Sequence, residues 1–407
     1  MPDTMQIGIA SADITPKKWV PGIIMAGFDI NRRATGVLDN LETGVLYIAD
    51  GRSELLLITV DAIGLMKPVV DRIRRGITGR LGREVPVIIA STHTHAGPDT
   101  LGLWGWGPLG VMPLRSGVNP DYMDFLIETI TVAGLNAVAS ARPGVLRIAP
   151  MAVPDTWVRN DRAHGIVDRA AYVLAVVGPD GGYRAVIVNF SAHPETLWEK
   201  NTLISADYPA AFRRRIRDLK KGVPMFFSGD LGGMLTPNCP EDAGLKQRQD
   251  FAGKLGESIA DLALQSLEKA SVTTRTSLRV MHVPMAVPVQ NMRFRLAHRM
   301  GILDREFPLD TVLTEVWVVR MEGLFVAVSC PGEMVPELGI QIRRLAGPGP
   351  VLLLGLCCDE LGYILTHEQF ASREYAYEQT MSCGPELTKK YLEKVDFLLN
   401  LQEEYTK

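Results

Sequence analysis

Short apolar runs and longer periodic segments alternate along the whole chain. The runs are rich in Val, Ile and Leu and end at Gly, Pro or Asp, which predicts buried strands. The periodic segments carry apolar residues every three or four positions, which predicts amphipathic helices. Strands are predicted within residues 7–13, 43–49, 55–60, 85–91, 145–153, 170–177, 183–190, 223–228, 277–289, 324–329 and 351–356. Helices are predicted within residues 67–82, 121–141, 207–220, 245–269, 334–346 and 386–402.

Turn residues indicate how neighbouring strands are joined. Asp50 and Gly51 separate two predicted strands and favour a hairpin, since Gly tolerates the positive φ that a tight turn requires. Such hairpins break a strict alternation of strand and helix, so the pattern predicts an α/β chain with mixed sheets. Asp61 ends a strand and is expected to cap the following helix. No repeat or long linker interrupts this order, and we expect one domain over residues 1–407.

Composition limits the classes of function. Of the 407 residues, 46% are hydrophobic and 22% are charged, and the formal net charge is -3, as in an ordinary globular protein. This charge gives no indication of nucleic acid or an anionic membrane as a partner. We see no apolar run of transmembrane length and no secretory signal before the first strand. The five cysteines are odd in number and irregularly spaced, so we expect free thiols and a cytoplasmic protein.

Candidate chemistry begins at the strand that ends in the sequence STHTHAGP. His93 and His95 are expected to share one face of this strand, because side chains two residues apart point the same way. Two imidazoles directed at one volume suggest a metal site. A structural role, with one histidine exposed and the other hydrogen-bonded, is an equal alternative for the tripeptide alone.

Three further potential ligands follow apolar strands later in the chain. His193, Glu333 and Tyr363 each come a few residues after such a strand, as His93 does. Open α/β sheets bind ligands beyond the carboxyl ends of their strands, so these side chains are predicted to meet. Two imidazoles and a carboxylate form a usual catalytic zinc set, which leaves a position for water. Taken singly, Glu333 as a helix cap and Tyr363 as a core residue are the more ordinary interpretations.

Several segments of the chain resemble a known family. The motifs are STHTHAGP, FSAHPETL, GGMLTPN, CPGEM and GYILTHEQF…YEQTMSCGP, with the opening GIASADIT and the strand TVDAIGL. They are similar, in the same order from about Ile7 to Pro385, to the motifs of the neutral, or non-lysosomal, ceramidases. The resemblance implies a layered αββα sandwich with a zinc site at the carboxyl ends of strands.

The resemblance also implies roles for individual residues. The zinc ligands of the family correspond to the four residues that the strand ends indicate, namely His93, His193, Glu333 and Tyr363. His95 is implied to stabilise the oxyanion of the tetrahedral intermediate. The tyrosine of the YE motif shares that task, and it corresponds to Tyr377 in preference to Tyr375.

The sequence departs from the pattern of the family in three respects. Thr236 stands where the family has a serine, which keeps a hydroxyl but adds a methyl group and a stiffer χ1. The active-site arginine of the family directly follows an asparagine, whereas Asn160 is followed by Asp161, so Arg162 or Arg159 takes that place. The 407 residues leave no room for the family's C-terminal immunoglobulin-like domain, and we expect the catalytic domain only.

These features together predict a zinc-dependent hydrolase that cleaves an N-acyl, ceramide-like amide bond by attack of zinc-bound water. The catalytic residues would be His95, Tyr377, Arg162 and Thr236. The substrate would be a small-molecule amide or ester. The apolar loop that contains Trp104 and Trp106 would suit an acyl chain, and it could equally flank a sugar or lactone ring.

Three other interpretations stay open. The protein could be a zinc-dependent esterase or lactonase of the same fold acting on a soluble substrate. It could also be a non-catalytic homologue that binds zinc. A metal site in a (β/α)₈ amidohydrolase barrel is less favoured, because it needs further histidines after later strands and only His193 meets that description.

Overall fold

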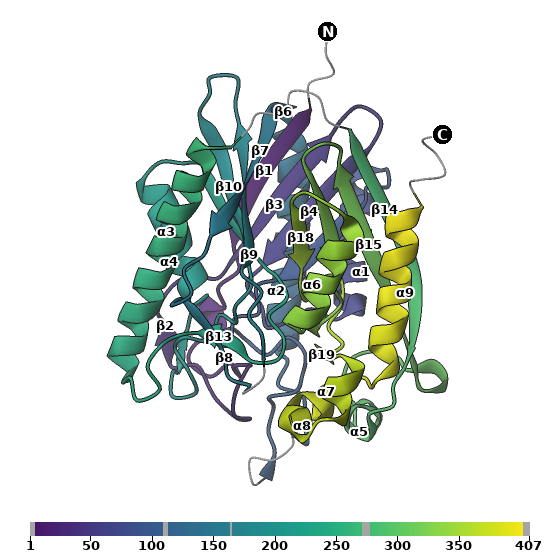
Figure 1. The fold of residues 1–407 in the computed structure, drawn as a ribbon. Helices are drawn as coiled ribbons and strands as arrows, with labels where there is room; N and C mark the ends of the chain where they lie inside the picture. The colour runs from purple at the N-terminus through teal and green to yellow at the C-terminus, as the bar shows by residue number, and fades with distance from the viewer. Residues whose placement is uncertain (1–4, 109–112, 163–164, 271–276, 402–407) are drawn as a thin grey trace.

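The structure is a computed structural model that describes residues 5–108, 113–162, 165–270 and 277–401 (Figure 1). Its strands are β1 (Gln6–Asp13), β2 (Gly36–Val37), β3 (Glu42–Ala49), β4 (Glu54–Val60), β5 (Val87–Ser91), β6 (Arg142–Pro143), β7 (Val145–Ala152), β8 (Val158–Asn160), β9 (Ala170–Val177), β10 (Tyr183–Phe190), β11 (Leu203–Ile204), β12 (Val223–Ser228), β13 (Leu235–Pro237), β14 (Leu278–Pro288), β15 (Thr311–Met321), β16 (Phe325–Ser329), β17 (Glu333–Met334), β18 (Val351–Leu354) and β19 (Tyr363–Ile364). Its α-helices are α1 (Lys67–Leu81), α2 (Pro120–Ala139), α3 (Tyr208–Asp218), α4 (Leu245–Glu268), α5 (Met292–Arg299), α6 (Pro336–Ala346), α7 (His367–Ala371), α8 (Ala376–Thr380) and α9 (Glu386–Asn400).

Three open sheets carry most of these strands. The first has the order β5-β4-β3-β1-β6, the second β12-β10-β9-β7 and the third β14-β15-β16-β18. Each sheet mixes antiparallel pairs with one parallel pair, which is β4 with β5, β10 with β12 and β16 with β18. The remaining strands of the described residues form the short pairs β11-β2, β13-β8 and β17-β19.

The first sheet is buried on both faces because its apolar residues alternate between two cores. Val45 and Tyr47 of β3 belong to a core that includes residues of α1 and α2, whereas Leu46 and Ile48 face the other way. The second core also contains apolar residues from the other two sheets. The first sheet therefore lies between a helix layer and a second layer of strands.

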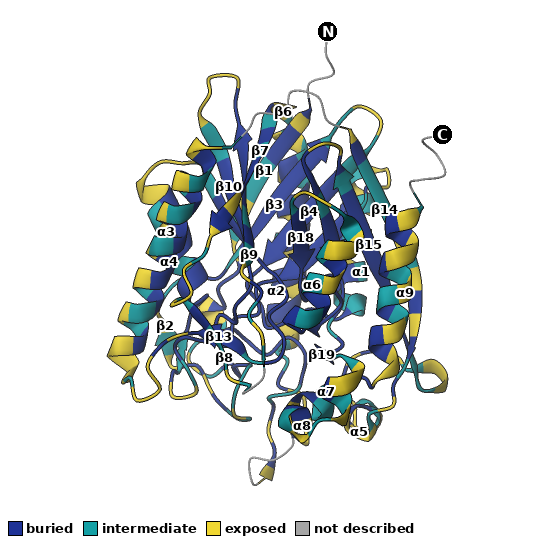
Figure 2. Cartoon of the chain, in the orientation of Figure 1, coloured by how far each residue is buried: buried dark blue, intermediate teal, exposed yellow. Residues whose placement is uncertain are grey.

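The second and third sheets together form that second strand layer. The Gly355 N–H donates to the Ser228 carbonyl at 2.9 Å, and Asn189 Nδ2 donates to the carbonyls of Phe227 and Leu353, so the edges of β12 and β18 adjoin. The outer face of the second sheet packs against α3 and α4, and that of the third sheet against α6 and α9. The order of layers is helix, sheet, sheet, helix, and the outer helices expose one side to solvent (Figure 2).

Most of the predicted elements are present, and the layered fold is confirmed. β3 and β4 form the hairpin expected at Asp50, and Gly51 has a φ of 87°. All five cysteines are free and buried, as expected. The pattern missed α5, the short helices α7 and α8, and the long strand β15.

The interpretation as an amidohydrolase barrel is wrong, because the described strands lie in open sheets with antiparallel neighbours. No helix among the described residues is long and apolar enough to span a membrane.

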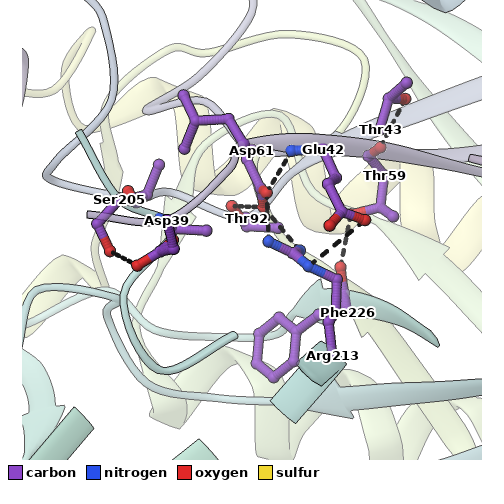
Figure 3. Close-up of polar contacts among 12 residues, drawn as sticks. Asp39, Glu42, Thr43, Thr59, Asp61, Thr92, Ser205, Arg213 and Phe226 are labelled. Carbon is purple, nitrogen blue, oxygen red and sulfur yellow. Dashed lines mark hydrogen bonds and ion pairs between the residues drawn. The ribbon is translucent and has the colours of Figure 1, made fainter. Parts of the chain in front are cut away.

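Asp61 does not cap a helix, so that expectation is wrong. The α1 helix begins six residues later, and the N–H of Lys67 donates instead to Asp359 Oδ1 at 2.9 Å. Asp61 is buried and forms a two-pronged ion pair with Arg213 of α3, with N–O distances of 3.1 and 2.5 Å (Figure 3). It also accepts hydrogen bonds from the N–H of Glu42 and the hydroxyl of Thr92. This network holds the ends of β4 and β5 against α3.

The buried ion pair should be sensitive to loss of one partner. Arg213→Met leaves the Asp61 carboxylate buried without its countercharge, and we expect the free energy of unfolding to fall by about 3–5 kcal/mol. Arg214→Met on the same helix is the matched control, because Arg214 and Glu257 form an exposed pair worth about 0–1 kcal/mol. Urea denaturation of both variants measures the difference, and equal small losses would contradict a structural role for the pair.

Candidate metal centre

His93 follows β5 but does not lie on it. The strand ends at Ser91, and His93 has a φ of 68°, in the left-handed region. The expectation that strand alternation aligns His93 with His95 is therefore wrong. The turn after the strand brings the two rings to a centroid distance of 4.8 Å instead. The His93 N–H donates to the Ala62 carbonyl at 2.9 Å, and Nδ1 lies 2.6 Å from the Ile63 carbonyl, so the segment just after β4 holds this strained residue in place.

His193 reaches the same place from the second sheet. It comes three residues after β10, and both its N–H and its Nδ1 bond to the Leu235 carbonyl of β13 at 2.9 Å. Its ring centroid lies 5.0 Å from that of His93 and 5.5 Å from that of His95. One nitrogen from each of the three buried imidazoles lies within 4.8 Å of the others. The described residues thus contain a three-histidine group that can bind a metal ion.

Glu333 and Tyr363 come from a short pair of strands that follows the third sheet. Beyond the ends of β16 and β18, the chain forms the short parallel pair β17-β19, in which Glu333 lies opposite Tyr363. Glu333 Oε2 lies 3.3 Å from His93 Nε2 and 3.0 Å from His193 Nε2. Burial raises the pKa of Tyr363 well above its ordinary value, and the adjacent Glu333 carboxylate raises it further. The other three predicted ligands therefore lie around the Glu333 carboxylate.

The hydrogen bonds of the two histidines indicate what this carboxylate faces. Because Nδ1 of His93 and of His193 each bonds to a carbonyl oxygen, Nδ1 must carry the proton. Nε2 of each neutral ring then presents a lone pair to Glu333 Oε2. Three electron pairs converging in a buried site repel one another unless a cation lies between them. The arrangement fits a divalent metal ion held by imidazole nitrogens and a carboxylate oxygen.

Without a metal, a proton takes the position of the cation. Burial lowers the pKa of His193, but Glu195 and Glu333 outweigh this effect and raise it to about 9. Burial alone would raise the pKa of Glu333, but His93 and His193 hold it well below its usual value. The group is therefore an ion pair at neutral pH, and metal binding must release a proton.

The ring of His95 lies close to those of His93 and His193 but has no hydrogen-bond partner among the described residues. Glu195 Oε2 lies 3.4 Å from its Nδ1. Burial, followed by the electrostatic effect of His93 and His193, lowers the pKa of His95 well below 6.5. Gly27, with a φ of 103°, passes so close that a Cβ there would lie 2.6 Å from the ring, and Arg32 donates to the His95 carbonyl. His95 is thus a neutral imidazole with free nitrogens.

Of the other predicted catalytic residues, Tyr377 lines the cavity beside the metal ligands and Thr236 does not. Tyr377 of α8 lines the cavity, and its ring centroid lies 6.1 Å from that of Tyr363. Partial burial, followed by the negative charges of Glu333 and Glu195, raises the pKa of Tyr377 to about 12. Tyr375 is instead part of the core. Thr236 is buried in β13 beside Leu235, and no contact with the cavity is seen.

The structure distinguishes the two candidate arginines. Arg162 Nε donates to Glu378 Oε1 at 2.7 Å, and although burial lowers the pKa of Arg162, the Glu378 carboxylate outweighs burial and raises it. Arg159 pairs instead with Asp161 and donates to the Cys239 carbonyl. Arg162 is thus linked to the residue that follows the cavity-lining Tyr377, whereas no contact of Arg159 with a cavity-lining residue is seen.

A cavity adjoins the metal ligands. It is about 60 Å³ in volume, a slot for a few water molecules. Its walls are mostly apolar side chains, namely Ile63, Met66, Leu101, Leu103, Trp104, Phe294, Leu303, Phe307, Leu361 and Met381. The loop predicted as an apolar wall thus contributes Trp104. Trp106 is 51% exposed and lies outside the cavity lining, and residues 109–112 of that loop lie outside the described residues.

Sequence reasoning missed several residues of this site. Glu195 follows His193 within the sequence HPE, and Glu378 follows Tyr377, so a search for acidic residues next to the motifs would have found both. Gly27 and Arg32 gave no such signal, because only the fold brings them to His95. Glu360 and Arg305, which also line the cavity, gave none either.

Comparison with known proteins identifies the fold. No family model and no curated protein matches the sequence. The crystal structure of neutral ceramidase from Pseudomonas aeruginosa is similar, with a TM-score of 0.80, 18% sequence identity, and coverage of 99% of this chain and 75% of that one. A ceramidase complexed with C2 gives a TM-score of 0.77, 17% identity, and coverage of 99% and 76%. The chain therefore has the fold of these ceramidases over nearly all of its length.

The proton on His193 should make metal binding depend on pH. We expect the affinity for Zn²⁺ to rise about tenfold per pH unit between 6.5 and 9, because one proton must leave a group whose pKa is raised to about 9. Titration against a competing chelator at several pH values measures this slope. Glu195→Gln removes a negative charge that raises the pKa of His193. The affinity of this variant for Zn²⁺ should therefore stop rising at a lower pH than that of the wild type. A wild-type affinity that is constant above pH 7 would contradict the assignment.

Proposed function

We propose that the protein is a zinc-dependent hydrolase that cleaves an amide bond of an N-acyl substrate. The observation that carries the proposal is the convergence of two imidazole lone pairs on Glu333 Oε2 at 3.0 and 3.3 Å, beside a mostly apolar cavity. The likeness to ceramidase structures supports the choice of an amide as the scissile group. At 17–18% identity this likeness concerns the fold, so the activity and substrate are our inference.

Four side chains would hold the metal, namely His93, His193, Glu333 and Tyr363. When bound, zinc lowers the pKa of a water molecule from 15.7 to about 7 and so supplies a nucleophile at neutral pH. The carbonyls of Ile63 and Leu235 fix the imidazole tautomers, which keeps both Nε2 atoms available. The closed surroundings of these residues exclude bulk water and strengthen their electrostatic effect.

Three further groups would act on the substrate carbonyl. Arg162 brings a permanent positive charge, and Tyr377 a hydroxyl that stays protonated because its pKa is raised. His95 offers a neutral N–H from beside the metal ligands. Such donors stabilise the negative charge that develops on the carbonyl oxygen. Glu378 would position Arg162 through its hydrogen bond. A role for Thr236 remains part of the proposal without a supporting contact.

The proposal also covers the cellular compartment of the protein and the kind of substrate. The five free, buried cysteines support a reducing compartment, and we infer the cytoplasm. The substrate would be a small molecule whose apolar part enters the slot lined by Trp104 and its neighbours.

Activity profiling tests the proposal directly. We expect zinc-loaded protein to hydrolyse at least one class among N-acyl amides and sphingolipid amides, to lose the activity on chelation, and to regain it with added zinc. Esters and lactones belong in the same panel, because the same chemistry cleaves them. Activity confined to esters or lactones would refute the amide assignment, and no activity on the whole panel would favour a non-catalytic zinc-binding protein.

Two alanine variants separate ligands from oxyanion donors. His93→Ala should lose both zinc and activity. His95→Ala should keep zinc but turn over about 10²–10³ times more slowly, the usual cost of one oxyanion donor. Metal analysis and steady-state kinetics measure the two effects, and His282→Ala is the control, because His282 stacks on Trp317 outside the site. Loss of zinc in His95→Ala would make it a third imidazole ligand, and zinc retained in His93→Ala would refute our ligand set.

A further inference from the structure

The helix α5 and the loop after it expose a large share of the protein's exposed apolar side chains. Sixteen large apolar side chains are exposed among the described residues, and five of them lie within residues 292–313, namely Met292, Leu296, Met300, Leu309 and Leu313. Single exposed apolar residues need no explanation, but a group of them in one short segment commonly marks a contact surface. Figure 1 shows α5 at the lower end of the molecule, away from both termini.

The exposed apolar residues of α5 form one stripe between two arginines. Met292, Leu296 and Met300 recur every fourth position and so share one face of the helix, which we call the α5 stripe. Arg293 and Arg299 each lie three residues from Leu296, about 60° around the axis on opposite sides of it. Both arginines are exposed and form no ion pair with the described residues. Arginines in this position bury their stems beside apolar groups and keep their charges at the edge.

The opposite face of the same segment is part of the cavity wall. Phe294 of α5 and Phe307 in the loop after it line the cavity. Asn291 Nδ2, at the start of α5, donates to the Thr380 carbonyl at the end of α8 at 2.8 Å, and α8 carries the half-exposed Tyr377. The α5 stripe therefore lies on the outer surface of the wall that encloses the cavity.

Leu309 adds a further exposed side chain next to this helix. It is 99% exposed, and its φ of 50° lies in the left-handed region, which a leucine rarely adopts. The neighbouring Asp310 holds the turn, because its carboxylate pairs with Arg295 of α5 at 3.1 Å and its carbonyl accepts the N–H of Val289 at 2.7 Å. The fold thus keeps an uncovered leucine beside α5 in a strained backbone conformation.

We propose that the α5 stripe, together with Leu309, docks on the surface of an anionic lipid bilayer. Apolar side chains between unpaired cations fit such a surface, because the former enter the interface and the latter meet lipid phosphates. The formal net charge of -3 gives no overall attraction, so the attachment is local to this segment. α5 contains no acidic residue, and the nearby Asp304 and Glu306 line a groove beside α1 with His298, which lies about 200° around the helix from Leu296.

Flotation with phospholipid vesicles tests the docking surface. The wild-type protein should float with vesicles of phosphatidylcholine mixed with phosphatidylserine. Leu296→Ser combined with Leu309→Ser should bind at least about tenfold more weakly, because the apolar area that enters the interface is lost. Leu345→Ser combined with Phe397→Ser removes two exposed apolar side chains from α6 and α9 and is the matched control. Equal binding by the two double variants would overturn the proposal.

The arginines are tested with a second pair of variants. Arg293→Gln combined with Arg299→Gln should lower binding to the mixed vesicles towards the level seen with phosphatidylcholine alone, and high salt should do the same to the wild type. Arg52→Gln combined with Arg344→Gln, which changes two exposed arginines elsewhere, is the control. If the wild type bound both kinds of vesicle equally, an anionic surface would not be its partner.

Activity assays keep docking distinct from the proposed function, on which the delivery of a lipid amide to the cavity rests. The serine variant of the stripe should match the wild type on a short-chain amide dissolved in water but hydrolyse a long-chain amide in mixed vesicles about tenfold more slowly. Flotation without hydrolysis of either substrate would refute the proposed function and leave docking intact. Hydrolysis of the dissolved amide without flotation would refute docking alone. So would a wild type that does not float and is dimeric without vesicles, with a monomeric serine variant, because the stripe would then join two copies of the chain.

Discussion

A buried carboxylate that faces two imidazole lone pairs is the constraint on which the rest of this structure depends. Glu333 cannot sit within 3.0–3.3 Å of both Nε2 atoms unless positive charge lies between them. In the protein without metal a proton on His193 meets that need. A divalent ion meets it better, because it is attracted to all three groups at once. The geometry of the surrounding protein serves to keep these groups close together in spite of their repulsion.

The scaffold achieves this by placing one ligand set at the end of each sheet. The segments after β5, β10 and β16 meet at Glu333, and the carbonyls of Ile63, just after β4, and of Leu235 in β13 fix the two histidine rings. Buried ion pairs stabilise the loops beyond those ends. Asp61 with Arg213 ties the first sheet to α3, and Asp359 with Arg305 ties the segment after α5 to α1. Charge thus fixes loops that apolar packing alone would leave free to shift.

The proposed function places two kinds of residue around one cavity. The predicted metal ligands His93, Glu333 and Tyr363 and the proposed oxyanion donors His95 and Tyr377 are among its lining residues. Apolar side chains make up most of the rest. A fold of this kind fixes where a reaction takes place, whereas single side chains in the slot decide which molecule fits.

Sequence by itself determined most of the long strands, most helices, and the three residues His93, His193 and Tyr363 that lie around Glu333. Buried strands can be predicted from the sequence because burial on both faces requires a continuous apolar run. Ligands at strand ends can be predicted because the carboxyl ends of neighbouring parallel strands lie at one edge of a sheet. Tertiary structure alone decided the turn that aligns His93 with His95, the contact of Arg162 with Glu378, and the pairing of Asp61 with Arg213. Each of these depends on contacts between residues far apart in the chain, and local pattern carries no information about such partners.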